Sequence, residues 1–382
     1  MRTEKEMTAP NPSVSADGGQ SFNVLTNNSI SENIDDFKPS EKSFEEMQRE
    51  MFRMMDPSYL KTVSMSELYE TVYQSKPPII DGLIYPGTHL FVGAPKTGKS
   101  FFVAQLAYHV STGIPLWDYP VRKGTVLYLA LEDDYKRLQG RLFRMFGTDS
   151  TKDLHFSVSA KHIGDGLDEQ LQGFVQEYPD TNLIIIDTLQ KVREMSVDKF
   201  SYASDYDVIT RLKNFADQQG ICLLLVHHTR KQQADDKFDM ISGTNGLLGA
   251  ADGAFLLQKE KRTSNSAILD ISGRDQQDQR LYLMKDTERL IWQLEKAETE
   301  LWKEPPDPVL DAVAAIVTAE QPEWIGSPTE LVGKLNLDMK PNALTMRLNV
   351  SAGRLQNEYD IRYENGRNHD GRYIKLSLIP EA

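Results

Sequence analysis

A loop with two fixed glycines carries the strongest chemical signal in this sequence. The pattern G-x-x-x-x-G-K-[ST] is filled at every position by Gly93-Ala94-Pro95-Lys96-Thr97-Gly98-Lys99-Ser100. In such a loop the backbone N–H groups wrap around phosphate oxygens, Lys99 reaches the β- and γ-phosphates, and Ser100 ligates Mg²⁺. A glycine turn that fits the whole pattern by chance is rare at ordinary glycine content. The motif therefore predicts that the chain binds ATP together with Mg²⁺.

Two carboxylates stand at the ends of apolar runs, where they could serve the same nucleotide. Asp187 follows Leu183–Ile186, and a buried strand would place it beside the loop, where it could hold Mg²⁺ through water; a helix-capping Asp is the alternative. Glu132 opens an acidic triplet after Thr125–Leu131 and could polarise the water that attacks the γ-phosphate. The triplet could instead be the solvated first turn of the next helix, an interpretation that best suits Asp134.

A further apolar run ends in two histidines. His228, in Val226-His227-His228-Thr229, could contact the γ-phosphate and report its loss to the loop that follows. Structural and metal-binding roles are the alternatives, although the sequence offers no third ligand for zinc. The polar segment 230–237 leads to Gly243-Thr244-Asn245-Gly246. This segment could bind a single strand of nucleic acid or be a solvated loop.

Short apolar runs separated by helix-length segments must position these residues. Four runs are apolar throughout rather than alternating, which is typical of strands buried on both faces of a parallel sheet with crossover helices. An α/β domain follows. Later runs predict a meander that extends the same sheet. The buried runs are His89–Val92, Thr125–Leu131, Leu183–Ile186 and Ile221–Val226, and the meander runs are Ala254–Gln258, Ala267–Ile271, Arg280–Leu283 and Leu290–Leu294.

The Pro-rich segment Lys303–Pro308 is the clearest break in the chain. After it, the pattern predicts a helix over Val309–Thr318, a second helix opened by the capping box Ser327-Pro328-Thr329-Glu330, and a third over Pro341–Leu355. Two strand-like runs around a polar turn come last. Three helices followed by a hairpin is the order of a winged-helix domain, so we predict a small C-terminal domain of this kind.

Arginines give this C-terminal part a weak positive charge. Arg347 and Arg354 on the third helix, with Arg367 and Arg372 in the hairpin, could meet DNA phosphates. Such a weak charge suits docking of another protein equally well. The expected division of the chain is an acidic, disordered segment over residues 1–60 with a short helix over Phe44–Met55, the α/β domain over 61–302, and the C-terminal domain over 303–382.

Composition narrows the class of protein further. The chain of 382 residues is 40% hydrophobic and 26% charged, which excludes global disorder. Cys222 is the only cysteine, so a disulfide framework and a Cys-rich zinc site are excluded. No apolar run approaches the roughly 20 residues of a membrane helix, and the N-terminus lacks the apolar core of a signal peptide, so we expect a cytoplasmic protein without membrane contact. The net charge of −13 argues against coating of nucleic acid by the whole surface but allows a local basic channel.

In their order along the chain, these motifs resemble a known family. GAPKTGKS after a strand, VLYLALEDD followed by RLQGRL, LIIIDT, LLLVHHTRK and GTNGLLGAADGAFLL are similar to the motifs of RecA-fold ATPases of the hexameric replicative-helicase type, and most closely to RepA-like AAA-family ATPases of plasmids, phages and integrative elements. The resemblance covers about Pro78 to Leu294. It implies a RecA-like core with a mostly parallel sheet, nucleotide and Mg²⁺ bound by Lys99 and Ser100, Glu132 as activator of water, Asp187 as the Walker B acid and His228 as a sensor.

In such rings the ATP site lies between subunits, and an arginine of the neighbour reaches the γ-phosphate. The strand position where replicative helicases carry a Lys-x-Arg pair is here Ser272-Gly273-Arg274, so only Arg274 carries over as that finger. Arg262 is the rival, and a surface salt bridge is the alternative for either residue.

Three functions fit these observations. The first is an ATP-driven motor, a homo-oligomeric and hexameric ring that moves on single-stranded DNA during replication of a mobile element, with a replication initiator or primase as a partner. The second is a nucleotide-gated regulatory or loading ATPase that binds DNA or protein through its C-terminal domain without unwinding. The third is a stand-alone metabolic kinase, for which the sequence offers neither an acceptor pocket nor a lid. The residues themselves supply only ATP binding and hydrolysis, and the resemblance supplies the DNA part.

Overall fold

A computed structural model describes most of the chain from Asp56 onward. The described residues are 48, 52, 55–60, 62–73, 76–193, 202–229, 238, 245–259, 261, 263–274, 276–298, 305–369 and 371–379. The expected disordered segment, most of the helix over Phe44–Met55, Arg262, Arg230 and nearly all of the polar segment after it lie outside these ranges. The chain divides into two compact units, one of residues 1–59 with Arg367–Asp370 and the other of residues 60–366 with 371–382. The sheet and the site described below belong to the second unit.

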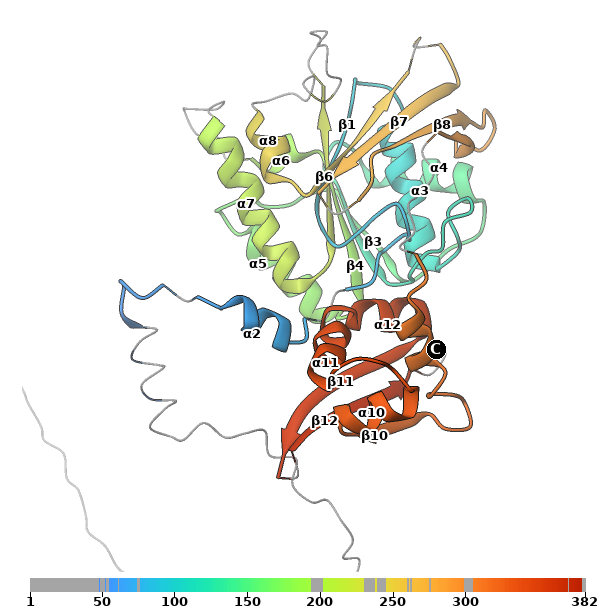
Figure 1. The fold of residues 1–382 in the computed structure, drawn as a ribbon. Helices are drawn as coiled ribbons and strands as arrows, with labels where there is room; N and C mark the ends of the chain where they lie inside the picture. The colour runs from blue at the N-terminus through green and yellow to red at the C-terminus, as the bar shows by residue number, and fades with distance from the viewer. Residues whose placement is uncertain are drawn as a thin grey trace, which may run out of the picture. The chain divides into compact units, whose positions relative to one another are not determined.

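The centre of the molecule is a nine-stranded sheet with the order β3-β2-β4-β5-β1-β6-β7-β8-β9 (Figure 1). Every neighbouring pair from β3 to β6 is parallel. Strand β1, which leads into the phosphate-binding loop, lies between β5 and β6, so the loop emerges at the middle of the sheet. The bounds are β1 Gly87–Gly93, β2 Thr125–Ala130, β3 Leu154–Ser157, β4 Thr181–Asp187, β5 Cys222–His228 and β6 Gly253–Gln258.

The last three strands of the sheet run as an antiparallel meander beside β6. They are β7 Ser266–Gly273, β8 Gln279–Lys285 and β9 Trp292–Ala297. The sheet is therefore mostly parallel, and both the α/β class with a RecA-like core and the extension of the sheet by the meander are confirmed. Because β8 runs in the same direction as β6 and β1, its last residue lies at the same edge of the sheet as the phosphate-binding loop.

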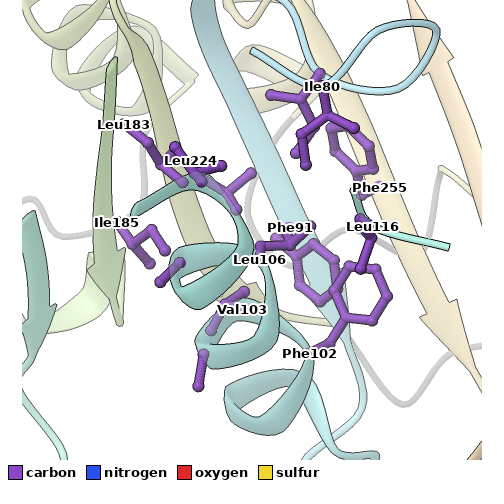
Figure 2. Close-up of a cluster of buried hydrophobic side chains, with 14 of the residues drawn as sticks. Ile80, Phe91, Phe102, Val103, Leu106, Leu116, Leu183, Ile185, Leu224 and Phe255 are labelled. Carbon is purple, nitrogen blue, oxygen red and sulfur yellow. The ribbon is translucent and has the colours of Figure 1, made fainter. Parts of the chain in front are cut away.

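Helices cover both faces of the sheet, and alternate residues of β1 supply both cores. Phe91 packs with residues of α3 and α4 on one face, whereas Leu90 and Val92 pack with residues of α5, α6, α7 and α8 on the other. Figure 2 shows Phe91 beside Phe102 and Leu106 of α3, with Leu183, Ile185 and Leu224 from the neighbouring strands. The helices are α3 Lys99–Thr112, α4 Tyr135–Phe146, α5 Leu167–Glu177, α6 Leu189–Val192, α7 Tyr202–Gln219 and α8 Asn245–Ala250, and the short α2 Met65–Glu70 precedes the sheet.

The C-terminal residues form four helices and a three-stranded sheet of order β10-β12-β11. Leu310, Leu331, Leu344 and Leu355, one from each helix, pack together with Ile374 of the sheet. The elements are α9 Pro308–Ala314, β10 Glu323–Gly326, α10 Pro328–Leu335, α11 Pro341–Val350, α12 Ala352–Tyr359, β11 Ile361–Asn368 and β12 Gly371–Leu378.

Three local predictions differ from the structure. Strand β3 was not expected because its four residues are all half-buried, so it lacks the apolar run that marks its neighbours. The single helix predicted over Pro341–Leu355 is wrong, since the chain forms two helices separated at Ser351. Strand β10 was also not expected; its residues alternate between exposed and half-buried positions over only four residues. The domain boundaries at 60–61 and 302–303 and the winged-helix assignment stay predictions.

Candidate functional site

The phosphate-binding loop folds as the glycine pattern requires. A Cβ atom on Gly93 would stand 2.5 Å from the carbonyl oxygen of Leu257, so no larger residue fits there. Gly98 has φ +103° and begins α3 as its N-cap, a left-handed conformation that glycine adopts at no steric cost. Lys96 is also in the left-handed region, with φ 67°. The loop thereby directs the N-terminus of a 14-residue helix at the space where phosphates would bind.

Trp292 of β9 forms a wall beneath this loop. It is fully buried, and a Cβ atom on Gly98 would lie 2.9 Å from its ring. Gln105 of α3 pairs with the Trp292 backbone twice, donating to its carbonyl at 2.9 Å and accepting from its N–H at 2.7 Å. Trp117 donates its indole N–H to the same carbonyl at 2.8 Å. The meander is therefore tied directly to the first turns of the phosphate-binding helix.

Lys99 is buried beneath the loop that it serves. Its Nζ donates to the carbonyl oxygens of Gly93 at 2.8 Å and Ala94 at 3.1 Å. Burial lowers the pKa of Lys99 to about 8, although the charges of Asp187 and Glu132 oppose the shift. A cation held in this way is poised to exchange loop carbonyls for phosphate oxygens.

Asp187, at the end of β4, is 6% exposed and hydrogen-bonded to its neighbours. The Tyr128 hydroxyl donates to its Oδ2 at 2.9 Å, and Ser100 also hydrogen-bonds the carboxylate. Burial raises the pKa of Asp187, while these two hydrogen bonds act in the opposite direction. The predicted Mg²⁺ ligand Ser100 and the predicted Walker B acid are thus in contact.

Glu132 follows β2 and lies next to Asp187. Its Oε1 accepts a hydrogen bond of 3.1 Å from the Thr188 hydroxyl, and the Glu132 side chain is otherwise exposed to the pocket. Asp134 caps α4 by accepting from the Arg137 N–H at 2.8 Å. The acidic triplet therefore divides as the sequence indicated, with Asp134 in the helix cap and Glu132 facing the loop.

His228, at the end of β5, completes the group. Its Nδ1 lies 3.1 Å from Lys99 Nζ. Burial and the Lys99 charge lower the pKa of His228, which favours the neutral ring that can accept a proton from the ammonium.

One pocket of about 520 Å³ gathers most of the predicted residues. Residues 95–100, Glu132, Asp187 and His228 line it, while Gly93 and Ala94 contribute the carbonyls that hold Lys99. Four residues that sequence reasoning missed complete the lining: Phe101, Arg141, Lys259 and Lys285. A signal for the two lysines did exist, because each stands at the end of a strand that a meander would direct toward the loop.

Arg274 lies at the opposite edge of the sheet from the loop. Its N–H donates to the carbonyl of Asp252, whose own N–H pairs with Thr88 at the start of β1, and its Nη2 donates to the Gly249 carbonyl at 2.7 Å. The side chain is exposed and does not line the pocket of its own chain. Its finger role stays a prediction, and any nucleotide that it reaches would have to belong to another copy.

Two of the C-terminal arginines proposed for DNA are engaged within the chain. Arg347 donates twice from Nη2 to the Asp307 carboxylate, at 2.8 Å each. Arg354 pairs with Glu358 at 2.9 Å. Arg367 and Arg372 are exposed, although Arg372 lies 3.9 Å from Glu70. The first two ion pairs favour the structural interpretation of those residues over phosphate contact.

The described residues hold no group of three or more His, Cys, Asp or Glu side chains able to bind a metal ion. Ser100 and Asp187 nevertheless offer the hydroxyl and carboxylate oxygens that Mg²⁺ prefers when phosphates supply the other ligands. Within the same ranges, every helix is too short or too polar to cross a bilayer.

The lysine and the aspartate predict a characteristic pH profile. Catalysis needs Lys99 charged, and because its pKa is lowered to about 8, that charge is lost as the pH rises through about 8. Catalysis also needs Asp187 ionised, and its raised pKa moves the acid limb upward. We expect kcat/KM for ATP to fall above about pH 8, and kcat to persist to higher pH because bound phosphate favours the ammonium. Steady-state rates measured across the pH range test this, and a constant kcat/KM through pH 9 would contradict it.

Comparisons with known proteins agree with this geometry. Residues 55–234 match the family described as an AAA domain. Among solved structures, one ATPase domain is similar at 15% identity, with a TM-score of 0.46 over 54% of this chain and 84% of that one. A DnaB-like replicative helicase, solved in a study of its interactions with primase, shows 15% identity and a TM-score of 0.45 over 66% and 71%.

A KaiC-like protein from the archaeon Pyrococcus horikoshii shows 14% identity and a TM-score of 0.42 over 59% and 99%. None of the curated proteins matches the chain. The family match covers the loop, both carboxylates and the histidine, which the structure brings together at the edge of a mostly parallel sheet. Residues 55–234 are therefore an AAA-family ATPase domain, built on the RecA-like fold that the sequence motifs predict.

Proposed function

We propose that this protein is an ATP-driven motor of the RepA type, a ring of identical subunits that hydrolyses ATP and moves on single-stranded DNA in the replication of a mobile genetic element. The observation that carries the proposal is the gathering of Lys99, Ser100, Asp187, Glu132 and His228 in one pocket. This set supports hydrolysis, because it combines phosphate binding, a metal-binding pair, a carboxylate for water and a group that contacts the phosphate-binding lysine.

Each residue has a part in the proposed reaction. The loop amides and Lys99 bind the β- and γ-phosphates, and Ser100 with Asp187 would hold Mg²⁺, which neutralises charge on the phosphates when bound. Glu132 orients the attacking water and accepts its proton. His228, in contact with Lys99, would respond when the γ-phosphate leaves and transmit the change to the residues after β5.

The ring part of the proposal is supported by the position of Arg274. An arginine at the opposite edge of the sheet from its own loop suits a subunit that completes the site of its neighbour. The DNA part is supported by the motif resemblance and remains to be tested by function.

A strand-displacement assay tests the motor. The wild-type protein should hydrolyse ATP faster with single-stranded DNA and should separate a forked duplex, and Lys99→Ala should do neither. Molar mass in solution with ATP should be a multiple of 43.4 kDa. ATPase activity without displacement, from a protein that binds DNA, would contradict the motor.

A nucleotide-gated regulatory or loading ATPase is the second candidate. The ion pairs of Arg347 and Arg354 favour it, because they leave the C-terminal helices less able to hold DNA phosphates. For this candidate, hydrolysis would be stimulated by a protein partner rather than by single-stranded DNA, so the same ATPase assay separates the two.

A further inference from the structure

A group of three cations lies beside the phosphate-binding loop and has no part in the proposed reaction. Arg141, Lys259 and Lys285 line the pocket at Phe101. Lys285 Nζ lies 3.7 Å from the centre of the Phe101 ring, and Arg141 Cζ lies 5.2 Å from it. Lys259 Nζ lies 5.4 Å from the centre of the Trp292 ring. We call these three residues the cation cluster.

Lys285 is the member of the cluster that lacks compensation. Among the residues that the structure describes, no carboxylate forms an ion pair with it, whereas Arg141 is paired with Asp133 at 2.7 Å and Lys259 donates to the Ser264 carbonyl at 2.8 Å. Burial, together with the charges of Lys259, Arg144 and Arg141, lowers the pKa of Lys285 to about 8. A half-buried ammonium surrounded by like charges is stabilised by an anion, and a ring face supplies only part of that stabilisation.

The two ends of the pocket carry opposite charge. The charges that act on Lys99 come from Asp187 and Glu132, whereas those that act on Lys285 come only from cations. The acidic end is where Mg²⁺ and the attacking water would lie, so it is the γ-phosphate end. Phe101 follows Ser100 on the first turn of α3, one step away from that end, and the cation cluster lies over Phe101.

We propose that Lys285, assisted by Lys259, binds the α-phosphate of the nucleotide seated on the loop. The inference rests on the proposed function, because it takes ATP as the ligand of the same pocket. Lys99 and Ser100 serve the β- and γ-phosphates, and the α-phosphate, next in the triphosphate chain, would lie toward Phe101 and the cluster. The meander supplies both lysines, since β6 and β8 run in the direction of β1 and end at its edge.

Affinity measurements on charge-removing variants test this assignment. Lys285→Met keeps the apolar stem over Phe101 and removes the charge, and we expect the Kd of ATP and of ADP to rise about tenfold or more each, as loss of a charge-assisted hydrogen bond predicts. Inorganic tripolyphosphate should weaken as well, because the contact is to phosphate. Lys285→Arg should bind ADP far more tightly than Lys285→Met does.

Lys296→Met is the matched control. Lys296 lies on β9 of the same sheet, is 66% exposed and stands 5.7 Å from the centre of the Tyr282 ring, so its loss should leave all three affinities unchanged. Unchanged affinities in Lys285→Met, or a loss confined to ATP, would overturn the assignment, the latter by pointing to the γ-phosphate. Weakened ATP and ADP with unchanged tripolyphosphate would also overturn it, by pointing to the base or ribose.

Thermal unfolding of each variant identifies a general loss of structure. A Lys285→Met protein with wild-type Tm and wild-type affinities overturns the inference alone. Failure of the wild-type protein to bind any of the three ligands overturns the proposed function itself.

Discussion

Glu132→Gln should lower kcat for ATP hydrolysis by about 10²–10⁴ while leaving the Kd for ATP nearly unchanged. The amide keeps the size and the hydrogen bond to Thr188 but cannot accept a proton from water. Because Glu132 is assigned to the water rather than to the phosphates, its loss should appear in the chemical step and not in binding. Single-turnover hydrolysis together with equilibrium binding of ATP separates the two quantities.

Asp134→Asn is the matched control for this change. It lies two residues further along the acidic triplet and serves the cap of α4, a role that Asn fills almost as well. Its kcat should stay close to the wild-type value. A Glu132→Gln enzyme with normal kcat would contradict the assignment of Glu132, and one with lost ATP affinity would place the residue in binding instead.

Trp292→Ala should lower the free energy of unfolding of the ATPase domain by about 3–5 kcal/mol. The ring is fully buried against the loop at Gly98, and its removal leaves a cavity directly beneath the phosphate-binding turn. We also expect weaker ATP binding, since the loop would lose the surface that fixes its position. Urea unfolding followed by circular dichroism, with and without ATP, measures both effects.

The same substitution at Trp324 provides the comparison. Trp324 is only half-buried, on β10 in the C-terminal part of the chain, so Trp324→Ala should cost clearly less and leave ATP binding intact. Equal losses from the two substitutions, or normal ATP affinity in a folded Trp292→Ala protein, would show that the wall is not needed to shape the loop.

The residues that the sequence predicted correctly are those with a local pattern. The loop, Glu132, Asp187 and His228 each follow a strand that is apolar throughout, and parallel strands bring their carboxyl ends to one edge. Their meeting in one pocket could therefore be predicted without knowing the order of the strands. The functional roles of these residues stay predictions.

The remaining wall of the pocket depends on contacts between distant parts of the chain. Trp292 begins an antiparallel strand with an ordinary amphipathic pattern, and nothing near it in the sequence indicates that it meets Gly98. Lys259 and Lys285 looked like solvated ends of strands, because charge alone does not distinguish a surface lysine from one that closes a pocket. The sequence placed Arg274 on a strand of the meander, but only the register of β6 and β7 locates it at the far edge.

The pairing of Gln105 with Trp292 joins residues that are 187 positions apart. During synthesis, every phosphate-binding group leaves the ribosome long before the strand that supports them. A nascent or prematurely terminated chain that ends before Trp292 would thus present the whole loop motif without its supporting wall. Tight nucleotide binding should consequently be reserved for molecules whose translation has passed the final strand of the sheet.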